Sequence, residues 1–199
     1  MFVTFEGLDG SGKSTQAQLL RDRLEADGVE VVLTREPGGT PLGEEIRELL
    51  LHGGEVAPWA EAALYAASRA QHVEQLIRPA LARGATVICD RYIDSSVAYQ
   101  GVARGLGGDR VFELNLAAVG GLLPDCTILL EIDVGEASAR MGTAPLDRIE
   151  REGDDFRAFV AQAYRDLAAQ FPERYVVVDG SAAREAIAKE IRGALRDHS

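Results

Sequence analysis

Lysine is almost absent from this 199-residue chain, which has only Lys13 and Lys189 among its 21 cations. Because arginine supplies nearly all the other positive charge, each lysine needs a specific explanation. A guanine-specific GTPase of the Ras type recognises its base with an Asn-Lys-x-Asp motif. Neither lysine stands in such a motif, since Lys13 follows Gly12 and Lys189 follows Ala188. The scarcity of lysine therefore argues against that class of protein.

Positive charge as a whole is also in deficit, with 21 cations against 32 acids, a net charge of −11 and a pI of about 4.8. This balance argues against general binding to nucleic-acid polymers or anionic membranes. Apolar runs such as Thr127 to Leu130 are far shorter than the roughly 20 residues of a membrane span. The start, Met1 to Glu6, lacks the basic segment of a secretory signal, so we expect a cytoplasmic protein.

Cysteine is scarce too, with two residues in the whole chain. Cys89 and Cys126 lie in apolar, strand-like runs at no metal-ligand spacing, so we expect two buried, reduced thiols rather than a disulfide. With 46% hydrophobic residues, a chain of this length can bury a substantial core. We predict one globular domain over residues 1–199.

The apolar residues alternate between short β-rich runs and longer amphipathic stretches, which is typical of repeated βαβ units around a parallel sheet. Five strands are predicted, at Phe2 to Glu6, Val29 to Thr34, Thr86 to Asp90, Cys126 to Ile132 and Tyr175 to Asp179. Helices are predicted at Gln16 to Leu24, Ile46 to Leu51, Glu61 to Leu81, Val111 to Val119, Phe156 to Phe171 and Ile187 to Leu195. Pro79 should kink or restart the third helix near Ile77-Arg78.

Residues Gly7 to Ser14 match the phosphate-binding motif G-x-x-x-x-G-K-[ST], with a predicted strand before it and a helix after it. In such a loop the backbone N–H groups converge on phosphates, and the helix dipole adds positive potential. We expect Lys13 to reach the β- and γ-phosphates of a bound nucleotide and Ser14 to offer its hydroxyl to Mg²⁺. An ordinary glycine-rich turn is the alternative, and the loop alone does not choose between a GTPase, an ATPase, a transporter subunit and a kinase. The candidate residues for binding the nucleotide, which is ATP if the protein is a kinase, are Gly7, Leu8, Asp9, Gly10, Ser11, Gly12, Lys13, Ser14 and Thr15.

Asp90 ends a predicted buried strand at the edge of the sheet that carries the phosphate loop, and Arg91 follows it. A carboxylate in this position can help to hold Mg²⁺ or its waters, whereas a strand-capping salt bridge is the alternative interpretation. Arg35 ends another strand run, and Arg69 follows Tyr65 by four residues on the same helix face. The planar guanidinium group suits phosphates and base carbonyls.

Residues 141–153 combine glycine, proline and several charges between two helical stretches. We predict that this segment is a lid that excludes water and brings an arginine to the transferred phosphoryl group. A charged loop between helices, with no such role, is the alternative.

Together these motifs resemble the thymidylate kinase (dTMP kinase) family. The resemblance rests on the phosphate loop, Thr34 to Thr40, Tyr65 to Gln71, Asp90-Arg91-Tyr92, Ser95 to Gly101 and Leu146 to Glu150, in the family's order. It covers essentially the whole chain. It implies an α/β, P-loop nucleoside monophosphate kinase-like three-layer fold, in which a five-stranded parallel sheet has helices on both faces and a short lid.

The resemblance further implies an enzyme that phosphorylates dTMP to dTDP with ATP, a step of dTTP synthesis, and that uses Mg²⁺. It also implies a homodimer, for which the apolar face of Ala60 to Ala67 is a candidate surface, although the same residues could belong to the core. Two alternatives remain open. One is a kinase for another nucleoside monophosphate or for a deoxynucleoside, and the other is a non-catalytic, nucleotide-dependent regulator.

By the same resemblance, the expected dTMP-binding residues are Asp9, Arg35, Glu36, Arg47, Tyr65, Arg69, Arg91, Ser96, Tyr99 and Gln100. Among them, Asp9 would hold the deoxyribose 3′-hydroxyl, and the arginines at 35, 47 and 91 would hold the phosphate. Arg69 would contact the thymine carbonyl, with Ser96 and Gln100 along the base edge. The Tyr65 ring would stack on the base, and Tyr99 would disfavour ribonucleotides.

Two features depart from the family pattern. The stacking position is usually phenylalanine, so the added hydroxyl of Tyr65 needs a partner or water. Some members carry a catalytic arginine in the phosphate loop, where this chain has Gly10, so the lid has to supply it. Arg148 is the first candidate, with Arg140 and Arg151 behind it. The expected catalytic residues are Lys13, Asp90, Arg91 and Arg148, and the expected metal ligands are Ser14 and Asp90.

Overall fold

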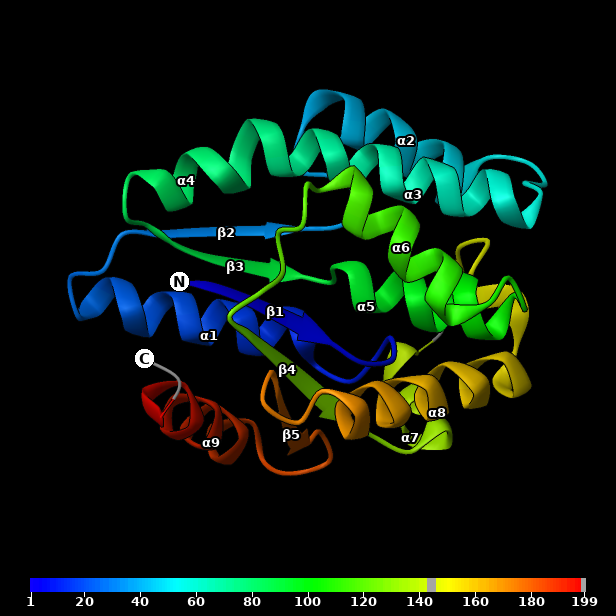
Figure 1. The fold of residues 1–199 in the computed structure, drawn as a ribbon. Helices are drawn as coiled ribbons and strands as arrows, with labels where there is room; N and C mark the ends of the chain where they lie inside the picture. Colours follow the sequence, from blue (N-terminus) through cyan, green and yellow to red (C-terminus); the bar gives the residue numbers. More distant parts are fainter. Residues whose placement is uncertain (143–145, 198–199) are drawn as a thin grey trace.

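The strands form one parallel sheet in the order β2-β3-β1-β4-β5 in the computed structural model, which describes residues 1–142 and 146–197 (Figure 1). The strands are β1 (Phe2–Glu6), β2 (Val31–Arg35), β3 (Thr86–Asp90), β4 (Cys126–Glu131) and β5 (Tyr175–Asp179). The predicted parallel α/β sheet is confirmed. Only β2 differs by more than one residue at an end, since it begins at Val31 rather than Val29.

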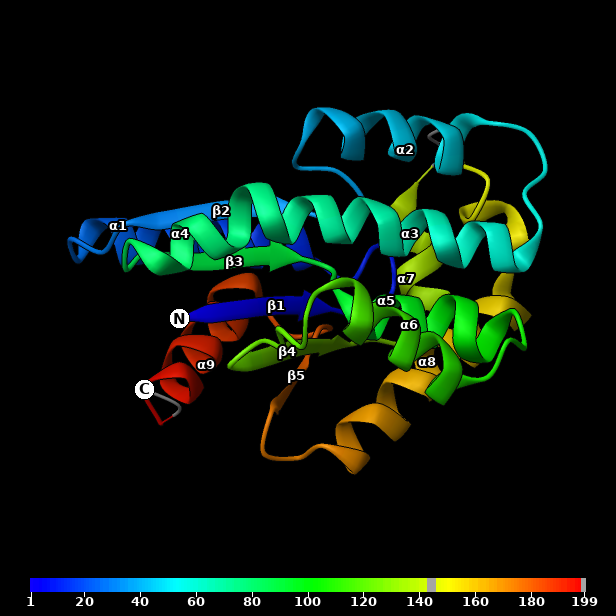
Figure 2. The ribbon, with the colours of Figure 1, turned by 45° about the horizontal axis from the view of Figure 1, so that its top comes forward.

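Helices cover both faces of this sheet (Figure 2). They are α1 (Lys13–Ala26), α2 (Pro41–His52), α3 (Pro58–His72), η1 (Val73–Ile77), α4 (Arg78–Ala82), α5 (Ile93–Ser96), η2 (Val97–Ala103), α6 (Gly108–Ala118), α7 (Val134–Met141), η3 (Glu150–Glu152), α8 (Asp154–Gln170) and α9 (Arg184–Asp197). Helix α2 begins five residues earlier than its apolar pattern predicts. The Thr40 side chain accepts a hydrogen bond from Gly43 N, and Pro41 occupies the first turn, which together form a favourable helix start.

Strand β1 is fully buried because helices pack against both of its faces. Val3 and Phe5 belong to the core cluster that includes apolar residues of α1 and α9, whereas Phe2 belongs to the cluster that includes residues of α4 and α8. A third cluster joins Ile46, Leu50 and Leu51 of α2 to Ile149. Removing apolar surface of this kind from water is the main contribution to stability. The third cluster also holds α2 and residue 149 next to the site described below.

Pro79 coincides with a change of helix type, at the place where the sequence predicts a kink or restart. Helix α3 passes into the π-helical turn η1, and α4 then begins at Arg78. Proline lacks an N–H donor and its ring conflicts with a preceding carbonyl group, so the wider turn directly before it accommodates the residue.

The apolar pattern of the sequence does not predict the helical segments at Ile93–Ala103 and Val134–Met141. The first is one turn of α-helix followed by a π-helical turn, so its apolar residues do not follow one regular period. The second is only eight residues long, although Asp133 caps it by accepting hydrogen bonds from Gly135 N and Glu136 N. Short elements of this kind depend on packing more than on local pattern.

The carboxyl ends of the strands point to one edge of the sheet, at the right of Figures 1 and 2, and both termini lie at the opposite edge. The chain first builds β2 and β3 on one side of β1 and then β4 and β5 on the other, so a topological switch point lies at β1. In open α/β sheets ligands bind in the crevice at such a point. The phosphate loop follows β1 directly and therefore occupies this position.

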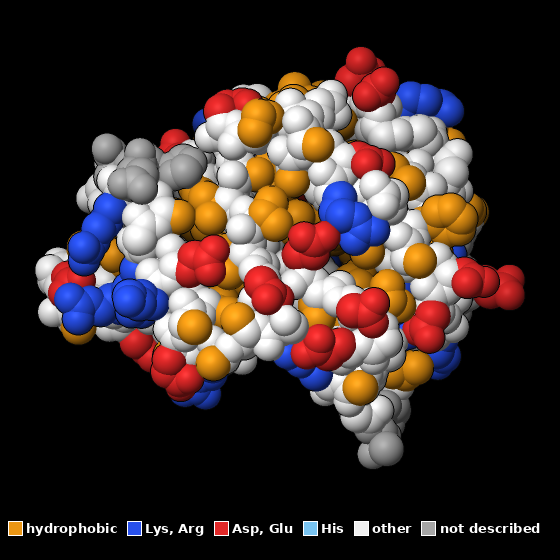
Figure 3. Space-filling view, turned by 90° about the horizontal axis from the view of Figure 1, so that it is seen from below, with side chains coloured by type: hydrophobic (Ala, Val, Ile, Leu, Met, Phe, Trp, Pro, Cys, Tyr) orange, Lys and Arg blue, Asp and Glu red, His pale blue; other side chains and the backbone are white. Residues whose placement is uncertain are grey.

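The face seen from below Figure 1, where α8 and α9 lie, carries acidic side chains distributed among apolar and basic ones (Figure 3). This distribution accords with the net charge of −11. No helix in residues 1–142 and 146–197 has the length and apolar character that a membrane crossing requires. Cys89 and Cys126 are both free and buried, as the sequence predicts.

Candidate active site

The phosphate loop, residues 7–14, turns sharply between β1 and α1. Gly7, Gly10 and Gly12 have φ angles of 134°, 83° and 96°, a region that favours glycine. A Cβ atom on Gly10 would clash with the carbonyl oxygen of Ala137. Any side chain at position 10, including an arginine, would therefore displace the backbone of α7.

Several features of the phosphate loop favour the binding of an anion. The Nζ of Lys13 donates to the Leu8 carbonyl oxygen over 2.7 Å, and the first turn of α1 carries no acidic residue to oppose its dipole. The hydroxyl of Ser11 is buried without a hydrogen-bond partner among the described residues. Burial lowers the pKa of Lys13, and the charge of Arg91 adds to this effect. A bound phosphate would satisfy the hydroxyl and stabilise the ammonium ion.

A pocket of about 370 Å³ opens beside the loop, and we call it the loop pocket. Of the expected ATP-binding residues, Asp9, Gly10, Gly12, Lys13, Ser14 and Thr15 line it. Gly7, Leu8 and Ser11 are buried and do not line it.

Ser14 and Asp90 meet at the loop pocket, and the Ser14 hydroxyl donates to Asp90 Oδ2 over 2.5 Å. They come from the first turn of α1 and the end of β3. Hydroxyl and carboxylate oxygens are the ligands that Mg²⁺ prefers in proteins, and Mg²⁺ usually takes only one or two carboxylates beside phosphate oxygens and water. The donor set therefore fits Mg²⁺ bound together with nucleotide phosphates.

Arg91 has a φ angle of 70°, which is costly for a residue other than glycine. This conformation turns its side chain into the site. Its Nη2 donates to Asp9 Oδ1 over 2.6 Å and to the Tyr99 hydroxyl over 3.3 Å, while Nη1 donates to Ser95 Oγ and the Tyr164 hydroxyl. Burial opposes ionisation of Asp9, but the charges of Arg91 and Lys13 hold the pKa of its carboxyl well below the usual value.

Glu6, at the end of β1, lies beneath this arginine and is fully buried. Its Oε2 accepts from Ser95 Oγ over 2.6 Å and from the Tyr164 hydroxyl over 2.9 Å, and its Oε1 accepts from Tyr92 N over 2.8 Å. Burial, reinforced by the nearby charge of Asp94, raises the pKa of Glu6 to about 7. Glu6 therefore fixes the hydroxyl groups that orient Arg91.

A second pocket, which we call the helical pocket, lies between α2, α3 and η2. Its lining includes the expected dTMP-binding residues Asp9, Glu36, Arg47, Tyr65, Arg69, Arg91, Ser96, Tyr99 and Gln100. Its volume is about 90 Å³ in this structure, which is below the several hundred Å³ typical of ligand pockets. The Tyr65 hydroxyl has no hydrogen-bond partner among the described residues, which leaves water or a ligand to supply one.

Arg69 projects from the last turn of α3 and is only 1% exposed. Its Nε donates to Glu36 Oε2 over 2.6 Å and its Nη2 to the Tyr92 carbonyl oxygen over 2.9 Å. Its Nη1 donates to Ser96 Oγ and Asn115 Oδ1. Four of the five guanidinium N–H groups are thereby used, and one remains for a ligand.

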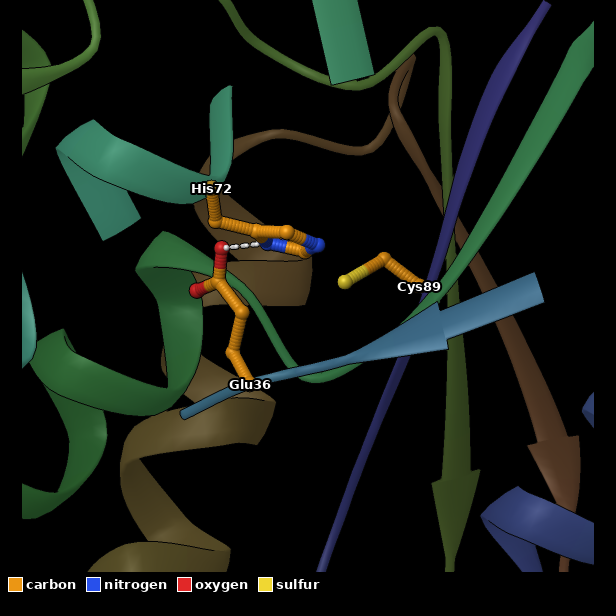
Figure 4. Close-up of side chains that lie close together, drawn as sticks. All are labelled: Glu36, His72 and Cys89. Carbon is orange, nitrogen blue, oxygen red and sulfur yellow. Dashed lines mark hydrogen bonds and ion pairs between the residues drawn. The ribbon is translucent and has the colours of Figure 1, made fainter. Parts of the chain in front are cut away.

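Glu36 is held in place by a buried histidine. The Nδ1–H of His72 donates to Glu36 Oε1 over 2.8 Å (Figure 4), and His72 Nε2 lies 2.7 Å from Thr34 Oγ1. Oxygen, nitrogen and sulfur atoms of Glu36, His72 and Cys89 lie within 4.8 Å of one another. Because both ring nitrogens are already hydrogen-bonded and the cation Arg69 pairs with Glu36, this cluster orients the carboxylate rather than offering a cation site.

Arg35 and Arg47 lie where the two pockets adjoin. Arg35 lines the loop pocket and forms an exposed ion pair with Glu44 over 2.9 Å. Arg47 lines both pockets and donates through Nη1 to the Pro37 carbonyl oxygen over 3.0 Å. Each retains N–H donors that a phosphate can use.

The lid candidates lie in three different places. Arg140, in the last turn of α7, lines the loop pocket and donates to the Gly180 carbonyl oxygen over 2.8 Å. Arg148 does not line that pocket, because its Nη2 lies 2.7 Å from Glu61 Oε2 and its Nε donates to the Leu50 carbonyl oxygen. Arg151 is exposed. Residues 143–145 of the predicted lid lie outside the described residues.

Several residues of the site were not predicted from the sequence. Asp147 and Ile149 line the helical pocket directly, and Glu61 is a buried carboxylate behind it. Glu61 did leave a signal, because it is a charged residue inside the apolar Ala60 to Ala67 stretch. Glu6 left one too, as an acid that ends a buried strand directly before the phosphate loop.

A phosphate-binding loop lies at the switch point of a parallel sheet, beside two pockets that share Asp9, Glu36, Arg47 and Arg91. This arrangement is typical of P-loop phosphotransferases. Comparison with known proteins narrows this class. The thymidylate kinase family model matches residues 5–191, and the chain belongs to that family.

Individual relatives support this assignment. The thymidylate kinase of Clavibacter sepedonicus is 56% identical over 195 residues, which cover 96% of this chain and 92% of the relative. That of Bifidobacterium longum is 50% identical over 202 residues, covering 99% and 98% respectively. The crystal structure of the Ehrlichia chaffeensis thymidylate kinase matches with a TM-score of 0.80 and 34% identity, over 98% of both chains.

Proposed function

We infer that this protein transfers the γ-phosphoryl group of ATP to dTMP, forming dTDP and ADP. One observation carries the assignment, in addition to family membership. The loop pocket and the helical pocket share four lining residues, so a nucleotide in each would bring their phosphates together at Arg91. A regulator that only binds ATP would have no use for the second pocket.

The loop pocket is the donor site. Backbone N–H groups of the phosphate loop and the N-terminus of α1 would hold the β- and γ-phosphates, with Lys13 neutralising the charge that develops on the transferred group. Ser14 and Asp90 would hold Mg²⁺, which supplies charge neutralisation and orients the phosphates when it is bound. The Ser14–Asp90 hydrogen bond already places the two oxygens together.

The helical pocket is the acceptor site. Arg91, Arg47 and Arg35 would hold the dTMP phosphate so that one of its oxygens attacks the γ-phosphorus in line. The bond between the γ-phosphorus and the bridging oxygen then breaks, and ADP takes its electron pair. The enzyme forms no covalent bond, so positioning and charge neutralisation account for the acceleration.

The remaining contacts to dTMP select its sugar and base. Asp9 would accept a hydrogen bond from the deoxyribose 3′-hydroxyl. The Tyr99 ring beside it would leave no space for the 2′-hydroxyl of a ribonucleotide. The ring of Tyr65 would stack on thymine while Arg69 donates to a carbonyl oxygen of the base. Ser96 and Gln100 would line the edge of the base, and Glu36 would act through Arg69.

We further propose that residues 141–153 form the lid and that an arginine at this edge completes the phosphate site. Arg148, the first candidate from the sequence, would have to leave Glu61 to reach the loop pocket. Arg140 already lines that pocket. This difference favours Arg140 as the arginine that contacts the transferred phosphoryl group.

The chain would work as a single kinase domain in the cytoplasm and as a homodimer. The proposed dimer surface is on α3, where Ala60, Ala63 and Ala67 are exposed at helical spacing next to the 40% exposed Trp59. These small residues do not belong to the core, so the surface is free in the described structure. Sedimentation at micromolar concentration tests this proposal directly.

A coupled ADP-release assay with a panel of monophosphates tests the function. Purified protein with ATP and Mg²⁺ should turn over dTMP with the highest kcat/KM, followed by dUMP, with ribonucleotides far lower. A preference for AMP, GMP or CMP would reject the assignment, as would ATP binding without ADP formation on adding any monophosphate.

A further inference from the structure

Glu61 is a carboxylate buried behind the helical pocket, 1% exposed, in the first turn of α3. Its Oε1 accepts from Gln100 Nε2 over 2.9 Å, and Arg104 donates to both oxygens over 3.3 Å. The Nη2 of Arg148 lies 2.7 Å from Oε2. Two arginine side chains thus lie against the Glu61 carboxylate, which is next to the side chain of Gln100 but does not itself line the pocket.

This arrangement fixes which end of the Gln100 amide faces the pocket. An ionised carboxylate accepts hydrogen bonds but cannot donate them. If the amide turned over, its Oε1 would face the carboxylate oxygen, and two buried acceptors would lie against each other with no hydrogen between them. With Nε2 held by Glu61, the amide offers Oε1, which has no hydrogen-bond partner among the described residues, to the pocket that Gln100 lines.

We propose that Glu61 is a positioning residue that determines base specificity by fixing this amide orientation. The pocket then presents an acceptor to a pyrimidine whose ring N3 carries a hydrogen, as in thymine and uracil. Cytosine has a lone pair at N3, which would face Gln100 Oε1, so it is rejected. This inference rests on the proposed function, because it concerns the base of the acceptor nucleotide.

The charged state of Glu61 is the feature that enforces the orientation. Arg104 also pairs with Glu152 over 2.6 Å and lies over the Phe156 ring, so it is held independently of Glu61. A glutamine at position 61 would keep the size of the side chain, but could either accept from Gln100 or donate to it. Gln100 would then be free to present Nε2 to N3 of cytosine.

The test compares kcat/KM for dTMP, dUMP and dCMP in the wild type, Glu61→Gln, Gln100→Met and the double variant. For Glu61→Gln the dTMP/dCMP ratio should fall about tenfold, the selectivity typical of one buried hydrogen bond. The dTMP/dUMP ratio should not change, because both bases carry the N3 hydrogen. In the Gln100→Met background, Glu61→Gln should leave the dTMP/dCMP ratio unchanged. Glu113→Gln removes an exposed charge from α6 and serves as the matched control.

The outcomes separate the inference from the function on which it rests. If Glu61→Gln leaves the dTMP/dCMP ratio unchanged, or shifts it equally with and without Gln100, Glu61 does not set base specificity. A parallel loss for all three nucleotides would show a structural role only and would also overturn the inference. If the wild type fails to phosphorylate dTMP, the proposed function itself is wrong. Should Glu61→Gln not fold, Glu61→Asp, which retains the charge but withdraws it from Gln100, is judged by the same ratios.

Discussion

Arg91 Nη2 donates to Asp9 Oδ1 over 2.6 Å and thereby joins the end of β3 to the phosphate loop. The two residues line both pockets, so this ion pair lies where donor and acceptor phosphates would meet. An incoming phosphate and a 3′-hydroxyl would compete for the same groups. The pair therefore neutralises two charges between the pockets and holds the end of β3 against the phosphate loop.

Replacing Arg91 by lysine tests whether catalysis needs the several N–H donors of the guanidinium group as well as its positive charge. A lysine cannot serve Asp9, Ser95, Tyr99 and Tyr164 at once, so we expect kcat/KM for dTMP to fall about 100-fold, or ~2.7 kcal/mol of transition-state stabilisation. Steady-state kinetics measure this. Arg21→Lys, at a half-buried position on α1 that lines neither pocket, is the control and should behave as the wild type. A loss below threefold in Arg91→Lys would contradict the assigned role.

Lys13→Met should reduce kcat by about 1,000-fold or more, because charge stabilisation of the transferred phosphoryl group is lost while the loop backbone remains. Far-UV circular dichroism and dTMP affinity should stay close to the wild type. The chain offers an exact chemical control in Lys189→Met, since Lys189 is its other lysine and is exposed on α9. Near-normal turnover in Lys13→Met would refute the phosphate-loop assignment.

The pKa of Glu6 gives stability a predictable pH dependence. Burial raises this pKa from 4.5 to about 7, so between these values the native state holds a proton that the unfolded state has lost. The stabilisation that this proton gives the native state is therefore complete below pH 4.5 and is lost as the pH rises through 7. Glu6→Gln removes the titration, so its free energy of unfolding relative to the wild type should rise by about 2–3 kcal/mol from pH 5 to pH 8.

Urea unfolding of both proteins at pH 5, 6, 7 and 8 measures the difference. Other titrating groups are common to the two proteins and cancel. A difference that does not vary with pH would mean that Glu6 is ionised in the native state throughout this range.

Single-turnover phosphoryl transfer in Arg140→Ala, Arg148→Ala and Arg151→Ala tests the arginine at the lid. Because Arg140 lines the loop pocket, we expect its removal to slow transfer most, by about 100-fold. Arg151 is exposed, so its removal should have the smallest effect of the three. A larger effect in Arg148→Ala would show that Arg148 leaves Glu61 during the reaction. If all three variants retain the wild-type rate, no lid arginine takes part.

The parts of the site that sequence could predict are those whose signal is local. The phosphate loop is one continuous segment, and Asp90 and Arg91 directly follow a strand whose end has to meet the same edge of the sheet. The resemblance to a family added the acceptor residues, most of which line the helical pocket.

The parts that sequence could not predict depend on contacts across long separations. Glu6 accepts from Tyr164, 158 residues away, and Glu61 accepts from Gln100, 39 residues away. The ion pair of Arg148 with Glu61 could not be predicted either, because the sequence of a charged loop does not indicate which buried acid it will contact. Helix packing decides these pairs, and no local pattern records it.

The most decisive measurement of direct, in-line transfer from ATP to dTMP uses ATP whose γ-phosphorus is chiral. The γ-phosphorus carries one sulfur and two different oxygen isotopes, and this group is followed through a single turnover. All of the label should appear on the β-phosphorus of dTDP, with one ADP formed per dTDP and with inverted configuration. Label released as inorganic phosphate or thiophosphate, label retained on the protein, or retention of configuration would contradict direct transfer between the two pockets.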